Sequence, residues 1–269
     1  MSTTQFLSTP QGRIAYDVTG EGPLVVLVPG MGDLRSTYRF LAPAISSAGF
    51  TAVTVDLRGH GESDATFTSY GDVETASDIT ALIESLGKPA VIVGNSMAAG
   101  AAAYVAATHP ELVTGLVLVG PFVRDPKTSA FQRLMFRIAM ATPWAAASWK
   151  SYLPNLYAGR KPADFDEHRT AIVNSIRRPG YAAAFSATTR TTHAAVEARL
   201  NDVMAPTLVV MGALDPDFAD PAAEAEWIAN TLKGTVVMVP DAGHYPHAQQ
   251  PDVVNPAVLD FIAKANANA

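Results

Sequence analysis

The chain contains no cysteine among its 269 residues, and charged side chains make up only 16% of them. The missing thiols exclude disulfides, cysteine nucleophiles and thiolate metal sites. The formal net charge is −6, and no run of lysine or arginine stands out. We therefore expect no binding to nucleic acid or to an anionic membrane surface.

Targeting and membrane-spanning segments are also not expected. Residues 1–10 lack the basic start and apolar core of a signal peptide. Uncharged apolar stretches of spanning length are missing outside the alanine-rich region after Ser96. That region includes Tyr104 and His109, which indicates a buried helix. A cytoplasmic protein, a monomer or a homodimer, is the expectation.

The apolar residues, 48% of the chain, occur largely in short β-branched runs bounded by glycine or proline. Such runs are typical of strands that are covered on both faces. Helical spacing appears between them, at 76–86 before Gly87 and again at 254–262. The alternation predicts an α/β fold with a mostly parallel, doubly wound sheet. The expected strands are 13–19, 23–28, 51–56, 90–93, 116–119, 206–211 and 235–239.

One long segment interrupts this alternation. Residues 121–203 contain no clear buried strand, but they carry many aromatic residues and are cut by prolines into short helical pieces. The strand pattern resumes at Pro206. We predict a core domain of residues 1–120 and 204–269, with a helical cap inserted at 121–203.

The strongest chemical signal is Ser96, in the sequence Gly94-Asn95-Ser96-Met97-Ala98 between a buried strand and an alanine-rich helix. A nucleophilic serine on a tight strand-to-helix turn needs small neighbours, because other backbone passes close by. The helix start behind it favours developing negative charge. The alternative is a serine that only caps the helix.

Two further candidates also follow predicted strands. Asp215 comes after the strand at 206–211, and His244 comes after the strand at 235–239. Ligands and catalytic groups collect at the carboxyl ends of strands in α/β sheets. Either residue alone could be structural, and Asp217 is a second possible acid. Taken together, the three positions predict Ser96 as nucleophile, His244 as base and Asp215 as the orienting acid.

The glycine-rich turn after the second expected strand supplies a possible oxyanion hole. Its Met31 backbone N–H, with that of Met97, could bind a developing oxyanion. An ordinary glycine turn is the alternative. The turn is not a dinucleotide fingerprint, because the third glycine is missing. We expect no cofactor.

The chain resembles the α/β-hydrolase superfamily, in the branch of cofactor-free esterases, perhydrolases and carbon–carbon bond hydrolases. Residues 56–64 (DLRGHGESD) resemble that branch's D-x-R-G-x-G-x-S-D segment, residues 212–215 its acid loop, and residues 243–251 its histidine loop. The departures are Pro29 for a usual histidine, Ala98 for the second glycine of the serine turn, and Gln249 for a glutamate. The resemblance implies the α/β-hydrolase fold with a helical cap. It gives the first segment a structural role, so Arg58, His60 and Asp64 are not placed in the site.

The expected activity is hydrolysis of small or medium carboxylic esters through an acyl-enzyme. The alternatives are a carbon–carbon bond hydrolase of ring-cleavage products and a slow-turnover ligand receptor on the same scaffold. No metal site is expected, and His247, three residues after His244, is interpreted as a surface or turn residue. The candidate substrate-binding residues are Gly30, Phe122, Trp144, Trp149 and Tyr245.

Overall fold

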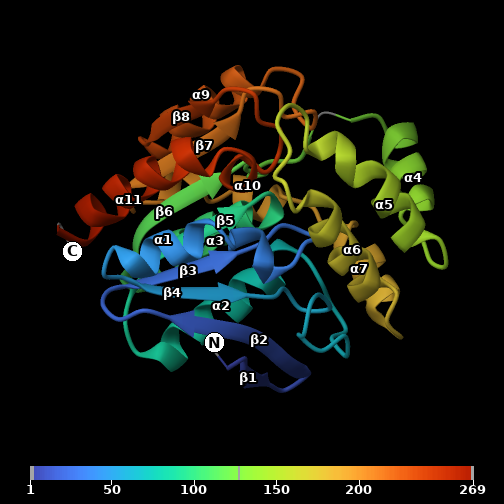
Figure 1. Cartoon of the computed structure of the whole chain (residues 1–269), viewed down its shortest axis with the longest axis horizontal. Helices are drawn as coiled ribbons and strands as arrows, with labels where there is room; N and C mark the ends of the chain where they lie inside the picture. The colour runs from blue at the N-terminus through green and yellow to red at the C-terminus, as the bar shows by residue number, and fades with distance from the viewer. Residues whose placement is uncertain (1–2, 127, 268–269) are drawn as a thin grey trace.

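A computed structural model describes residues 3–126 and 128–267 (Figure 1). The described residues form one eight-stranded sheet in the order β1-β2-β4-β3-β5-β6-β7-β8. β2 is antiparallel to both of its neighbours, and the other pairs are parallel. The predicted mostly parallel sheet is therefore confirmed. The strands are β1 (Gln5–Thr9), β2 (Gly12–Thr19), β3 (Leu24–Val28), β4 (Thr51–Val55), β5 (Ala90–Asn95), β6 (Val113–Val119), β7 (Thr207–Gly212) and β8 (Thr235–Val239).

Helices cover both faces of this sheet (Figure 1). Alternate residues of each strand point to opposite faces. Val26 and Ile92 therefore pack with α2, α3 and α9, whereas Val25 and Val93 pack with α1 and α11. The α-helices are α1 (Leu41–Ser47), α2 (Asp72–Leu86), α3 (Met97–Thr108), α4 (Ala130–Ala139), α5 (Ala145–Leu156), α6 (Phe165–Ile176), α7 (Tyr181–Thr188), α8 (Ala194–Glu197), α9 (Pro221–Leu232), α10 (Pro246–Gln249) and α11 (Pro251–Ala267). The 3-10 helices are η1 (Arg35–Tyr38), η2 (Pro110–Leu112) and η3 (Leu200–Asp202).

The edge strand β1 was not predicted from the sequence. It pairs only with β2, and its side chains are mostly exposed. Its sequence, QFLST, lacks the continuous apolar run that marks the buried strands. An edge strand that is half in water needs no such run, so hydrophobic patterning alone does not detect it.

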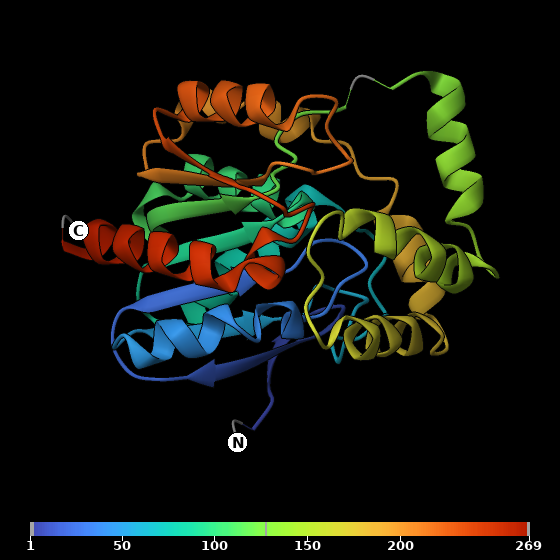
Figure 2. The ribbon, with the colours of Figure 1, turned by 45° about the horizontal axis from the view of Figure 1, so that its top comes forward.

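Between β6 and β7 the described residues form α4 to α8 and η3, with no strand (Figure 2). α5, α6 and α7 enclose a separate apolar cluster built around Trp149, Leu153, Ile172 and Phe185. Tyr245, from the loop after β8, joins the same cluster. The helices α5, α6 and α7 are thereby packed against the end of the sheet where the predicted site lies, and α4 to α8 together are called the inserted helices.

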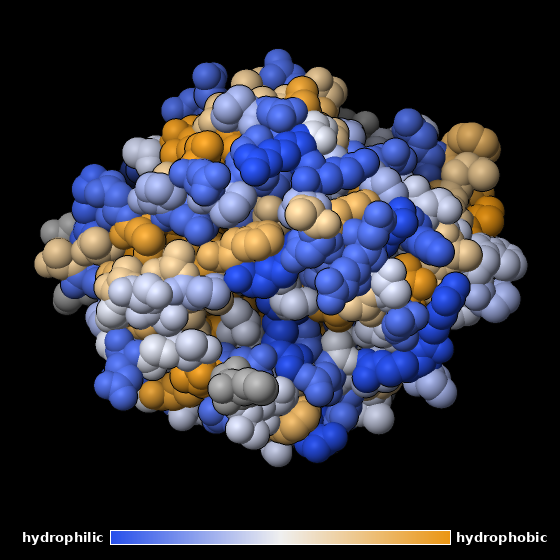
Figure 3. Space-filling model, in the orientation of Figure 1, coloured by the Kyte–Doolittle hydropathy of each residue, from blue (hydrophilic) through white to orange (hydrophobic). Residues whose placement is uncertain are grey.

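α4 stands at the outer edge of the inserted helices (Figure 2). Its residues Phe131, Leu134, Met135 and Ile138 lie on one helical face and are 47–70% exposed. A hydrophobic surface lies over α4 at the right edge of Figure 3. None of the described helices combines the length and apolar character that crossing a membrane requires.

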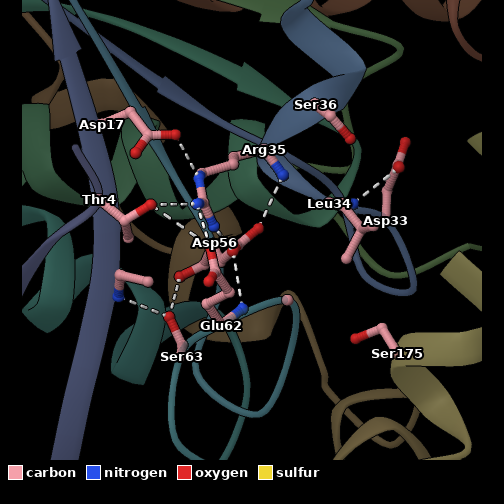
Figure 4. A network of polar contacts seen from close by, with 12 residues as sticks. Thr4, Asp17, Asp33, Leu34, Arg35, Ser36, Asp56, Glu62, Ser63 and Ser175 are labelled. Carbon is pink, nitrogen blue, oxygen red and sulfur yellow. Dashed lines mark hydrogen bonds and ion pairs between the residues drawn. The ribbon is translucent and has the colours of Figure 1, made fainter. Parts of the chain in front are cut away.

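The segment 56–64 is anchored to the core by Arg35 of η1 (Figure 4). This guanidinium pairs with Asp17 on β2, with the buried Asp56 at the end of β4, and with Glu62. Ser63 closes the segment by donating its hydroxyl to the Asp56 carbonyl at 2.8 Å. The network holds the loop after β4 beside the loop that follows β3.

Candidate active site

Ser96 lies on a sharp turn between β5 and α3. Its backbone has φ 57° and ψ −126°, a conformation that residues other than glycine rarely adopt. Gly94 is required here, because an added Cβ would lie 2.4 Å from the Ala98 carbonyl oxygen. Ala98 itself sits in the first turn of α3 and is fully buried, so a methyl group is accommodated at this position. The turn presents the Ser96 side chain at the carboxyl end of the sheet.

Asp215 and His244 follow β7 and β8, and the loop that carries His244 lies beside the serine turn. The amide of Asn95 donates to the His244 carbonyl at 3.3 Å, which links the loop after β8 to the end of β5. A Cβ added at Gly120, just after β6, would lie 3.1 Å from His244 Nδ1 and 3.2 Å from Asp215 Oδ2. Three residues predicted from separate parts of the chain therefore lie at one end of the sheet.

His244 and Asp215 form a short hydrogen bond, with Nδ1 2.7 Å from Oδ2. The Asp217 Oδ2 atom lies farther away, at 3.7 Å. Burial lowers the pKa of His244, but the two carboxylates outweigh it and raise the pKa to about 9. Because Asp215 holds Nδ1, Nε2 is the nitrogen that can accept a proton from a serine. The distances support Asp215 as the orienting acid.

Asp217 has a partner from the inserted helices. Tyr152 of α5 donates its hydroxyl to Asp217 Oδ1 at 2.9 Å. Burial raises the pKa of Asp217, and the charge of Asp215 adds to that effect. Sequence reasoning considered Asp217 only as a competing acid and did not find Tyr152, whose helix carries no motif.

Among the described residues, Asp215, Asp217 and His244 form the one group with ligand atoms close enough, within 4.8 Å, to surround a metal ion. The two carboxylates already accept hydrogen bonds. Asp215 accepts from the imidazole, and Asp217 accepts from Tyr152. This donor set fits an acid–base group better than an open metal shell.

The loop after β3 passes directly against the serine. A Cβ added at Gly30 would lie 2.8 Å from the Ser96 Cβ, so only glycine permits this approach. Met31 follows in the same loop, and Met97 is the first residue of α3. The N–H groups of a first helical turn have no acceptor within the helix. Met31 and Met97 are therefore both close to Ser96 along the backbone, and the oxyanion hole formed by their N–H groups stays a prediction.

The loop is fixed one residue further on. Gly32 donates its N–H to His60 Nε2 at 3.0 Å, and its carbonyl accepts from Trp149 Nε1 at 2.8 Å. Asp33 then pairs with His168 of α6 at 2.8 Å. Burial would raise the pKa of Asp33, but His168 outweighs it and lowers that pKa. Residues 29–33, called the oxyanion loop after the predicted role of the Met31 N–H, are thus contacted directly by His60, which the sequence interpretation left out of the site.

The predicted substrate-binding residues lie in different environments. The Phe122 ring lies 5.9 Å from the His244 ring, beside the candidate triad. Tyr245 is buried and stacks on Tyr157 at 4.6 Å. Trp144 is 49% exposed, and its indole N–H donates to the Ile138 carbonyl. Trp149, as described above, supports the oxyanion loop from a buried position. Of these aromatic residues, Phe122 is therefore best placed to contact a bound substrate.

Two other histidines have roles that the sequence did not indicate. His193 stacks on Phe122 at 5.6 Å, and its Nδ1 lies 2.7 Å from the buried Asp72. His247 was interpreted as a surface or turn residue, and this is wrong. It is fully buried, and its Nε2 lies 3.0 Å from the Thr37 hydroxyl. Burial lowers the pKa of His247 to about 3, so it stays neutral as part of the core.

Comparison with known proteins identifies the family of this chain. Residues 25–257 match the model of the alpha/beta hydrolase family. The chain is 28% identical to 2-(acetamidomethylene)succinate hydrolase of Mesorhizobium japonicum, over 93% of this chain and 92% of that protein.

Solved structures share the fold. A bromoperoxidase from Bacillus anthracis superposes with a TM-score of 0.84 at 19% identity, covering 98% of this chain and 100% of that one. An esterase from Exiguobacterium antarcticum also gives 0.84 at 19% identity, covering 97% and 100%. Sequence and fold together show that this chain belongs to the alpha/beta hydrolase family.

Proposed function

We propose that this protein is a serine hydrolase that cleaves small or medium carboxylic esters. One observation carries the proposal. A serine at positive φ on a strand-to-helix turn lies at the same end of the sheet as a buried histidine–aspartate pair, joined at 2.7 Å. A serine held in such a conformation points to a function, because strained backbone clusters at functional sites.

The proposed reaction has two steps. Ser96 Oγ attacks the ester carbonyl carbon while His244 Nε2 takes its proton, and the carbonyl electron pair moves onto oxygen, where the N–H groups of Met31 and Met97 bind it. Collapse of this intermediate expels the alcohol, which receives the proton from His244. Water, deprotonated by the same imidazole, then releases the carboxylic acid and restores Ser96. Asp215 stabilises the imidazolium in both steps.

The inserted helices would act as the cap over this site, as proposed for residues 121–203. Their support for the proposal is direct contact with the groups named above: Trp149 and His168 bind the oxyanion loop, and Tyr152 binds Asp217. The half-buried Phe122 and Phe218 add apolar surface near the imidazole and suit an uncharged acyl group.

The relatives are compatible with this activity. The Mesorhizobium protein and the Exiguobacterium protein are named as a hydrolase and an esterase. Both names describe hydrolases, and the first acts on a small molecule. A small-molecule ester is accordingly the proposed substrate of this chain.

Activity towards p-nitrophenyl esters of graded chain length tests the proposal. We expect hydrolysis by the natural protein and none by Ser96→Ala. A fluorophosphonate probe should label the natural protein and not the variant. A ring-cleavage dienoate, run beside the ester, separates the carbon–carbon bond alternative. Preference for the dienoate, or an unlabelled protein that hydrolyses no ester, would overturn the proposal.

A further inference from the structure

The histidine of the candidate site faces a second carboxylate. Asp217 Oδ2 lies 3.7 Å from His244 Nδ1, the nitrogen that Asp215 Oδ2 contacts at 2.7 Å. The Asp217 side chain is 19% exposed, and the imidazole is 2% exposed. At this distance a charge acts on the imidazole with little screening by solvent. One carboxylate suffices to orient the ring, so the second needs a separate explanation.

Asp217 is held in place from two sides. Its own backbone N–H donates to Asp215 Oδ1 at 3.1 Å, so the two acids share one turn. Its Oδ1 atom accepts the Tyr152 hydroxyl at 2.9 Å, which directs Oδ2 towards the imidazole. Tyr152 belongs to α5, in the segment inserted between β6 and β7. The position of the second carboxylate therefore depends on the inserted helices.

We propose that Asp217 is a positioning residue that adds its negative charge to the catalytic imidazole, and that Tyr152 fixes it there and so couples the inserted helices to the triad. This inference rests on the proposed function for its catalytic meaning. The charge on the imidazole does not depend on which bond is cleaved.

The electrostatic consequence has a definite sign. The titratable groups that act on Asp217 are His244, Asp215 and Tyr152, and Asp33 adds to the two carboxylates at the imidazole. A negative charge near His244 raises its pKa, so its removal lowers that pKa. The hydrogen bond from Tyr152 favours the charged form of Asp217, so its loss raises the pKa of the carboxyl. Asp217 then carries its charge over a narrower pH range and supports the imidazolium less.

The test measures the pKa of His244 by NMR titration of the natural protein and of three variants. No substrate is needed, so this readout stands even if esters prove not to be the substrate. Asp217→Asn should lower the pKa by about one unit. Tyr152→Phe should lower it in the same direction by a smaller amount. Glu226→Gln removes the same charge from an exposed position on α9 and should leave it unchanged.

The acid limb of the pH–rate profile provides the catalytic readout. The base must be neutral to accept the serine proton, so the acid limb follows the pKa of His244. Because the neighbouring carboxylates raise that pKa, we expect the limb of the natural protein above the ordinary imidazole value of about 6.5. In Asp217→Asn the limb should move to lower pH along with the NMR value. An unchanged His244 pKa in folded Asp217→Asn, or an equal shift in Glu226→Gln, would overturn the inference while leaving ester hydrolysis intact. Failure of ester hydrolysis with the NMR shift present would overturn only the proposed function.

Discussion

At the scale of single residues, the backbone conformation of Ser96 lowers the stability of the fold while it positions the proposed nucleophile. Its φ of 57° with ψ −126° costs a side-chain-bearing residue about 1–3 kcal/mol. Glycine adopts such a conformation freely. The serine is therefore retained against a local penalty.

We expect Ser96→Gly to be more stable than Ser96→Ala by about 1 kcal/mol, because only glycine relieves the backbone strain. Both variants should lack ester hydrolysis. Urea unfolding of the two variants beside the natural protein measures the difference. Equal stabilities would show that the turn is not strained, and activity in either folded variant would remove Ser96 from the mechanism.

The two carboxylates near His244 should differ sharply in their effect on rate. Asp215→Asn removes the 2.7 Å partner that fixes the tautomer, and a loss of about 10⁴ in kcat is expected. Asp217→Asn leaves this contact in place, so most of kcat should remain at a pH above the limb. Steady-state kinetics with one p-nitrophenyl ester decides between them. A greater loss in Asp217→Asn would mean that the triad acid has been assigned to the wrong residue.

At the scale of secondary-structure elements, the oxyanion loop depends on a contact from α5. Trp149 is 2% exposed, and its indole N–H donates to the Gly32 carbonyl at 2.8 Å. A Cβ on Gly32 would collide with the same indole, so the loop and the helix fit closely. The loop that carries the Met31 N–H is therefore fixed by α5 through Trp149.

Trp149→Phe keeps an aromatic ring but removes the donor to Gly32. We expect kcat to fall about tenfold with little change in KM, since losing a direct oxyanion donor costs more, about 10²–10³. Trp144→Phe is the matched control, because that indole is exposed and serves the Ile138 carbonyl. If the two variants behave alike, the indole of Trp149 contributes only packing.

What the sequence could predict at this scale follows from how local each signal is. The buried strands and the elements carrying Ser96, Asp215 and His244 were predictable, because apolar runs and glycine turns lie within a few residues of each other. β1 was not predictable, because a half-exposed edge strand needs no apolar run. The contacts of Tyr152, His168 and Trp149 were also missed, since aromatic spacing in short helices does not tell which face meets the core.

At the scale of the whole molecule, an ion network around the buried Asp56 joins distant parts of the chain. Arg35 contacts Asp17 on β2, Asp56 at the end of β4 and Glu62, as Figure 4 shows. Asp56 is almost fully buried, and burial raises its pKa. Such a carboxylate depends on its cation, because solvent cannot replace it.

Arg35→Met should destabilise the protein by about 3–5 kcal/mol, since it leaves the buried Asp56 carboxylate without its cation. Urea unfolding monitored by circular dichroism gives the value. Arg13→Met is the control: it breaks the ion pair with Asp64, in which the arginine side chain is 54% exposed, and should change stability little. A mild effect of Arg35→Met would mean that Asp56 takes up a proton or reaches water instead.

Tyr152, Trp149 and His168 make three polar contacts from the inserted helices, and these contacts bear on when the site is reactive. Each reaches a group of the proposed chemistry or the loop that supports it. If these helices swing away to admit a substrate, the contacts are lost together. On the proposed mechanism, the open protein then lacks the contacts that fix the oxyanion loop and Asp217. It is therefore inactive while Ser96 is accessible to bulk water and to molecules that are not substrates. On the same mechanism, full reactivity is restored only when the bound substrate is small enough for the helices to close over it. Closure of the helices would then select substrates by size.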